Sequence, residues 1–245
     1  MAMSTAELER AADEAWERLD AGDAAGALEA VHRGRQRARR GAPEDVDLLA
    51  DLSLLEGLAF LDLCRFEEAR RVLETLAREF DDASAEHALG LLAERRGERR
   101  EAERRFARAR RLAPADFPAP IVLSQAEFDA AVEAALRELP EPVRRWLENV
   151  AIAVEDIPPD DDLTGSDPPH PPSILGIFRG SPLGDKASMD PWSHFPSSIV
   201  LYQKNLQRFA RTRQELVEEI RTTLLHEVGH FLGLDEEELA EMGLD

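Results

Sequence analysis

The stretch Thr212–Gly233, TRQELVEEIRTTLLHEVGHFLG, decides how the C-terminal half of this chain folds. Thr212 and Glu215 form an S/T-x-x-E pattern, which is typical of the first residues of a helix. Apolar residues then recur at helical spacing, and Gly233 is a typical helix end. We therefore expect one long helix over residues 213–232.

This helix carries the pattern H-E-x-x-H at His226, Glu227 and His230. Two histidines four residues apart lie on the same face of a helix, where their imidazole nitrogens can hold one Zn²⁺ ion. A carboxylate beside such an ion can take a proton from water and return it to a leaving amine. The sequence predicts a zinc site with Glu227 as the catalytic base. The alternative is two ordinary histidines beside a surface glutamate.

A catalytic zinc usually has three protein ligands. In the extended pattern H-E-x-x-H-x-x-G-x-x-H, the third ligand lies six residues after the second histidine. Glu236 occupies that position here, Asp235 is the next candidate and Glu237 the third. Asp235 and Glu238 also form a capping pattern, which predicts a last helix through Met242. If Asp235 caps that helix, Glu236 remains available for the metal.

The remainder of residues 118–245 is rich in proline and alternates helices with short apolar segments. β-branched and aromatic residues in such segments are typical of strands. We expect an α+β domain, with long proline-rich loops that shape a cleft. Its expected helices lie near 125–138 and 141–148, and its expected strands at 150–155, 174–178 and 198–202.

Residues 1–117 have a different composition, rich in the helix formers Ala, Leu, Glu and Arg. A short pattern ending in alanine recurs at Ala27, Ala69 and Ala102. Ala69 and Ala102 are 33 residues apart, close to the tetratricopeptide period of about 34. Ala27 and Ala69 are 42 residues apart, which indicates an insertion in that unit. Helices are expected near 4–20, 23–40, 44–63, 66–79, 83–96 and 99–113.

This half resembles a tetratricopeptide-repeat array of three helical hairpins. The resemblance implies a surface that binds a peptide or a partner protein. The alternative is a helical cap with no ligand of its own.

The charge of the chain limits its partners. The formal net charge is -20, with most of the excess acid after residue 117. Phosphate backbones and anionic membrane surfaces attract basic proteins, so we expect neither nucleic acid nor membrane as a partner. One cysteine, Cys64, permits no disulfide within the chain. We found no signal-peptide pattern and no apolar stretch long enough for a bilayer, and we expect a cytoplasmic protein.

The stretch from Phe128 to Gly243 resembles the bacterial zincin-like metallopeptidases that end soon after an H-E-x-x-H-x-x-G motif. The matching segments follow the order of that family. They are FDAAVEAALRELP at 128–140, NVAIAVED at 149–156, LGIFRGSPL at 175–183, then 196–202 and 226–235.

The resemblance implies a minimal metzincin-like fold, a mixed sheet with the zinc site on its helix. It implies that His226 and His230 are ligands and that Glu227 is the base. Glu236 matches the acidic third-ligand position, where the family often has aspartate. In zincins an extended peptide pairs with a sheet edge above the metal, and our candidate for that edge is the segment Ser198, Ile199, Val200, Leu201 and Tyr202.

Two functions from different classes fit these observations. The first is a zinc-dependent peptidase whose helical repeats recruit a protein substrate or partner. The second is a non-catalytic, repeat-based binding module with a structural or vestigial zinc site. A complete H-E-x-x-H favours the first, because a structural site has no use for Glu227. Peptide deformylases share the motif, but their metal-binding cysteine has no counterpart, since Cys64 lies in the repeats.

Overall fold

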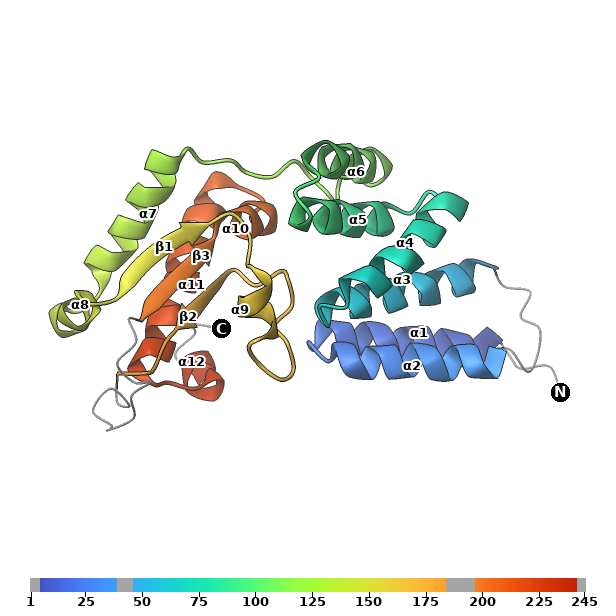
Figure 1. Ribbon diagram of the computed structural model, residues 1–245, viewed down its shortest axis with the longest axis horizontal. Helices are drawn as coiled ribbons and strands as arrows, with labels where there is room; N and C mark the ends of the chain where they lie inside the picture. The colour runs from blue at the N-terminus through green and yellow to red at the C-terminus, as the bar shows by residue number, and fades with distance from the viewer. Residues whose placement is uncertain (1–4, 39–45, 184–196, 242–245) are drawn as a thin grey trace. The chain divides into compact units, whose positions relative to one another are not determined.

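The computed structural model describes residues 5–38, 46–183 and 197–241, and the chain divides into two compact units (Figure 1). The first unit comprises residues 1–118 together with 163–172, and the second comprises 119–162 and 173–245. The main division lies one residue from the expected boundary at 117/118. The segment Leu163–Pro172, which we assigned to the second domain, groups with the first unit.

In the described part of residues 1–118, six helices pack as three hairpins, α1 with α2, α3 with α4, and α5 with α6 (Figure 1). Each helix begins and ends within two residues of the position expected from the sequence. The bounds are Thr5–Asp20 for α1, Ala24–Ala38 for α2, Val46–Asp62 for α3, Phe66–Glu79 for α4, Ala83–Arg95 for α5 and Arg99–Leu112 for α6.

The three hairpins share one turn geometry. Gly22, Cys64 and Gly97 take the left-handed conformation with φ of 75°, 57° and 73°. In each turn this residue donates its N–H three residues back and the next residue donates five residues back, which satisfies carbonyls at the helix end. Five residues beyond each turn lies a buried alanine, at positions 27, 69 and 102. The expected sequence repeat therefore corresponds to a structural repeat, while the tetratricopeptide assignment stays a prediction.

The second unit has mixed α and β structure, so the chain as a whole is α+β. The expected long helix extends over Arg213–Leu232 as α11, and a last helix follows it. Two short helices, α9 and α10, were not expected. The remaining bounds are Gln125–Glu138 for α7, Glu141–Leu147 for α8, Ala151–Glu155 for β1, Asp160–Thr164 for α9, Gly176–Arg179 for β2, Ser198–Tyr202 for β3, Gln203–Phe209 for α10 and Glu236–Glu241 for α12.

The three strands form one mixed sheet in the order β1-β3-β2. β3 runs parallel to β1, with Ala151 opposite Ser198, and antiparallel to β2, with Gly176 opposite Leu201. Our expectation that Ser198–Tyr202 forms a free edge is therefore wrong. Both hydrogen-bonding sides of this strand are already used by its neighbours, so no peptide can add to it.

Alternation along the strands gives the sheet two different faces. Ile199, Leu201 and Phe178 lie on one face, in a core cluster with apolar residues of α7 and α11. Tyr202 and Arg179 lie on the opposite face. Each fully buried Leu or Ile contributes about 1.5–3 kcal/mol through removal of apolar surface from water, so this core holds α11 firmly on the sheet.

Among the helices that the structure describes, none combines the length and the apolar character needed to cross a lipid bilayer.

Candidate metal centre

The helix that carries the two histidines begins at a well-defined cap. The Thr212 hydroxyl accepts a hydrogen bond from Glu215 N at 3.1 Å. The Glu215 carboxylate accepts in turn from Arg211 N at 2.9 Å, where a standard capping box would use Thr212 N. Ile220, Leu224 and other apolar residues of α11 are fully buried. The rotation of α11 about its axis is thus fixed by its apolar stripe.

The imidazoles of His226 and His230 converge on a common point. Their Nε2 atoms are 3.0 Å apart, and the ring planes are nearly perpendicular at 85°. Two nitrogen ligands at tetrahedral positions around one zinc ion would be about 3.3 Å apart. Both rings are partly exposed, so a metal ion can reach them. This spacing fits a shared ion.

The tautomer of His230 is set by a backbone carbonyl. Its Nδ1 lies 3.3 Å from Leu234 O. A carbonyl oxygen can only accept a hydrogen bond, so Nδ1 carries the proton and Nε2 presents its lone pair. Contacts of this kind orient metal-binding histidines and fix their tautomer. The chain just after the helix therefore prepares His230 for coordination.

The end of α11 is held from two sides. Gly233 has a φ of 93° and donates to His230 O at 3.1 Å, while Leu234 N donates to Gly229 O at 3.1 Å. These two bonds form a Schellman motif. Leu183 N, from the segment that follows β2, donates to Phe231 O at 2.7 Å. The last turn, which contains His230, is thus fixed by its own cap and by a neighbouring segment.

Glu227 lies between α11 and the sheet and is only 5% exposed. It approaches β2 at Gly176, where an added Cβ would lie 3.2 Å from Glu227 Cγ and 2.7 Å from Thr223 Cγ2. The backbone of the neighbouring strand β3 also approaches closely, since Val200 O would lie 3.1 Å from the same Cβ. Because Gly176 has no side chain, the Glu227 side chain can pack against β2 at this position.

The chain after α11 turns into α12, as the capping pattern predicted. Asp235 N donates to Glu238 Oε2 at 3.0 Å, and Glu238 N donates to Asp235 Oδ1 at 2.9 Å. Leu239 of α12 lies on Gly229 of α11, where an added Cβ would be 2.2 Å from Leu239 Cδ2. Glu236 is the first residue of α12, and its side chain lies outside the described part of the structure, as does Met242.

Residues 147–244 match the model of the zincin-like metallopeptidase family. The matched stretch includes the whole sheet, α11 and the two histidines. No curated protein matches the chain. At the level of the family, the match supports a zinc-dependent peptidase with a peptide substrate.

Residues 147–244, called the zincin-like domain from here on after the family model that they match, offer no complete three-ligand set among the side chains that the structure describes. The Asp235 carboxylate accepts the capping hydrogen bond from Glu238 N. Of the three candidates for a third ligand, Asp235 thus has a structural role already. Glu237 is exposed on α12, and Glu236 keeps the position that the sequence pattern assigns to a ligand.

Tyr202 has a structural role in the zincin-like domain. Its hydroxyl donates to the Asp162 carboxylate, which also receives Arg179 Nε at 2.8 Å. Arg179 Nη1 also donates to Glu155 Oε1 at 3.0 Å. Burial and the neighbouring Asp162 raise the pKa of the Tyr202 phenol, and the two carboxylates, Asp162 first, raise the pKa of Arg179. This network lies on the face of the sheet opposite α11, so Tyr202 does not face the two histidines.

Two functional positions were missed in the sequence, Gly176 and Gly229. Both carried a signal. A glycine within a strand often marks the close approach of another segment, and a glycine within a helix costs about 1 kcal/mol relative to alanine unless packing requires it. In the zincin-like domain, Gly176 admits Glu227 and Gly229 admits Leu239.

Proposed function

We propose that the zincin-like domain is a zinc-dependent peptidase in which His226, His230 and Glu236 hold the metal and Glu227 is the general base. The observation that supports this proposal is the convergence of the two Nε2 atoms at 3.0 Å, within a segment that matches a metallopeptidase family. An uncommitted pair of helix histidines has no need for such convergence or for a carbonyl partner on the far ring nitrogen.

The third ligand is proposed from the position of α12. The Asp235–Glu238 cap and the contact of Leu239 with Gly229 hold the first turn of α12 next to the end of α11. Glu236 begins that turn. A carboxylate is a common third ligand in catalytic zinc sites that have two histidines.

When bound, zinc lowers the pKa of water to about 7 and polarises the carbonyl of the scissile bond. Glu227 receives the proton of the attacking water and returns it to the nitrogen of the leaving amine. Its burial against β2 restricts its rotamers, so the carboxylate is already positioned before substrate arrives. The Leu234 carbonyl keeps the proton of His230 on Nδ1 throughout.

The substrate backbone is proposed to bind along β2. Among the described strands, β2 pairs on one side only, with β3. It is also the strand that Glu227 contacts, at Gly176. A peptide that adds to this strand by backbone hydrogen bonds passes beside the carboxylate. The three hairpins of the first unit are proposed to recruit the protein that carries this peptide.

Metal analysis and a cleavage assay test the proposal together. We expect one zinc per chain in protein purified without added metal, and cleavage of members of a peptide library. Glu227→Gln should keep the zinc and lose cleavage by about 10²-fold or more. Bound zinc with no cleavage of any peptide would favour the non-catalytic binding module instead.

Two matched variants test the ligand assignment. Glu236→Ala should release zinc to a chelator faster than Asp235→Ala, because the first removes a ligand and the second only a cap. The reverse order would assign the third position to Asp235.

A further inference from the structure

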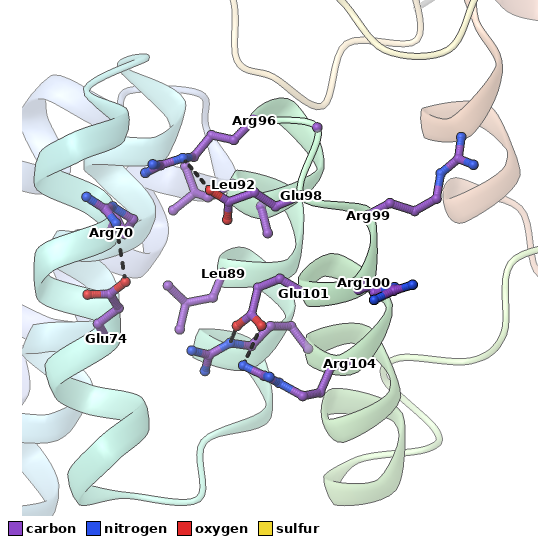
Figure 2. Close-up of a pocket in the computed structure, with 13 residues that line it drawn as sticks. Arg70, Glu74, Leu89, Leu92, Arg96, Glu98, Arg99, Arg100, Glu101 and Arg104 are labelled. Atoms are coloured by element: carbon purple, nitrogen blue, oxygen red, sulfur yellow. Dashed lines mark hydrogen bonds and ion pairs between the residues drawn. The ribbon is translucent and has the colours of Figure 1, made fainter.

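A groove of about 760 Å³ lies on the first unit, between α4, α5 and α6 (Figure 2). Arg70 and Glu74 of α4 form one wall, and Leu89 and Leu92 of α5 lie at its base. Residues of α6 and of the turn before it form the other wall. None of these residues belongs to the proposed peptidase site.

The lining is rich in arginine. It contains three glutamates, at 74, 98 and 101, and twice as many arginines. The helix α6 carries seven arginines and only two glutamates, in a chain whose net charge is -20. The arginines that line the groove are Arg70, Arg96, Arg99, Arg100, Arg104 and Arg105.

The glutamates of the groove are already paired. Arg96 contacts Glu98 at 3.0 Å (Figure 2). Arg105 contacts Glu101 at 2.8 Å. Arg99 and Arg100, at the rim, are exposed and form no ion pair with any residue that the structure describes. Arg70 and Arg96 also contact Glu67, and Arg105 also contacts Glu86, which lie outside the lining. The excess positive charge of the groove in the described structure is therefore that of its two rim arginines.

We infer that this groove binds an acidic protein segment, rich in Asp or Glu side chains. This inference rests on the proposed recruiting role of the first unit and names its partner class. Guanidinium groups bind carboxylates through two parallel hydrogen bonds, and they are less strongly hydrated than ammonium groups. Arginines on both walls can hold successive carboxylates of one segment, while Leu89 and Leu92 provide an apolar base for its side-chain stems.

Nucleic acid fits this groove less well. No aromatic side chain lines it, so it offers no platform on which bases could stack. Its three glutamates lie among the arginines and would repel a continuous row of phosphates. A peptide can place neutral residues opposite those glutamates, which a phosphate backbone cannot do.

The test uses the full chain with Glu227→Gln, so that a bound peptide is not cleaved. The probe is a short fluorescein-labelled peptide of alternating glutamate and leucine, followed by fluorescence anisotropy, beside the same peptide with glutamine in place of glutamate. We expect the acidic peptide to bind at least about tenfold more tightly, which is about 1.4 kcal/mol, and to weaken as salt is raised.

A matched pair of variants locates the binding. Arg96→Gln with Arg104→Gln removes two exposed arginines of the groove, and Arg110→Gln with Arg111→Gln removes two arginines of α6 outside it. Both changes have the same effect on net charge. We expect the first to weaken peptide binding about tenfold and the second less than about twofold. Circular dichroism would confirm that both variants fold.

Equal losses in the two variants, or equal binding of the two peptides, would overturn the proposal. Tighter binding of a single-stranded oligonucleotide of the same charge would assign the groove to nucleic acid instead. Neither readout depends on zinc or on cleavage. A chain that binds the acidic peptide but holds no zinc would refute only the proposed peptidase. A chain that holds zinc but does not bind the acidic peptide would refute only the proposed binding by the groove.

Discussion

Leu239 of α12 lies directly on Gly229 of α11, at a point where an added Cβ would be 2.2 Å from Leu239 Cδ2. This contact holds the helix that begins with Glu236 against the helix of the two histidines. Gly229→Ala should push α12 away. We expect faster loss of zinc to a chelator, by about 10-fold or more, as for other changes that disturb the support of a metal ligand.

A second change separates displacement of α12 from general damage to α11. Leu239→Ala combined with Gly229→Ala removes the clash, so the double variant should retain zinc better than Gly229→Ala alone. If Gly229→Ala holds zinc as tightly as the wild type, α12 does not supply a ligand.

Gly176 and Glu227 give a prediction about the catalytic base. Gly176→Ala places a methyl group 2.7 Å from Thr223 Cγ2 and 3.2 Å from Glu227 Cγ. We expect Glu227 to shift and cleavage to fall by about 10²-fold, the scale expected for a misplaced catalytic group. Zinc content should stay the same, because the three atoms nearest the added methyl belong to Thr223, Val200 and Glu227 and not to either histidine.

Thr223→Ser provides the control, since it removes the nearest clashing atom, Cγ2, and keeps the hydroxyl. Added to Gly176→Ala, it should restore part of the activity, and alone it should change activity little. Loss of zinc in Gly176→Ala would show that the strand supports the histidines rather than the carboxylate.

The long helices, in which apolar residues recur at helical spacing over many residues, were predictable from the sequence. The helix of the two histidines was expected over 213–232 and has those bounds, because a cap, an apolar stripe and a terminal glycine agree. The same holds for α7, whose Ser124 cap is a complete capping box. Local patterns of this kind determine where a helix begins and ends whatever surrounds it.

Strand order was not predictable in the same way. Ser198–Tyr202 was expected correctly as a strand and wrongly as an edge. Its burial on both faces, at Ile199, Val200, Leu201 and Tyr202, is typical of a central strand. Five residues of sequence do not indicate which strands will pair with them, because strand neighbours are determined by tertiary packing. The short α9 and α10 were missed because five or seven residues are too few to establish a helical period.

For the candidate metal site too, the sequence predicted the local geometry but not the contacts from distant segments. The spacing of His226 and His230 determines that their side chains share a face of α11, and the structure places their Nε2 atoms together. The supports come from distant segments. Leu183, Gly176 and Leu239 reach α11 through tertiary contacts that no local pattern contains.

Asp62, the last residue of α3, gives a prediction about pH. Burial raises the pKa of its carboxyl from the usual 3.8 to about 6. Between these values the folded chain keeps a proton that the unfolded chain has lost. The free energy of unfolding therefore falls as pH rises from about 4 to about 6, by at most about 3 kcal/mol.

Asp62→Asn should remove this fall and stabilise the first unit at neutral pH. Urea unfolding followed by circular dichroism, repeated at several pH values, measures the effect. Asp47→Asn, at the other end of α3, is the matched control and should keep the pH dependence. An unchanged slope in Asp62→Asn would show that the carboxyl is hydrated in solution.

Cys64 occupies a backbone position that two equivalent turns give to glycine. Its φ is 57°, beside 75° at Gly22 and 73° at Gly97. Left-handed backbone costs a residue with a Cβ about 1 kcal/mol or more. Cys64→Gly should therefore be more stable than Cys64→Ala by about 1 kcal/mol in urea unfolding. Both variants lose the thiol contact to His170 O, so the comparison isolates the backbone.

The reverse change tests the same cause at a second hairpin. An added Cβ on Gly97 would meet no atom within 4 Å, so Gly97→Ala can lose stability only through its backbone. We expect a loss of about 1 kcal/mol, matching the gain at Cys64. A neutral Gly97→Ala together with a neutral Cys64→Gly would mean that the turns relax without cost, and the three hairpins would then not share one constrained geometry in solution.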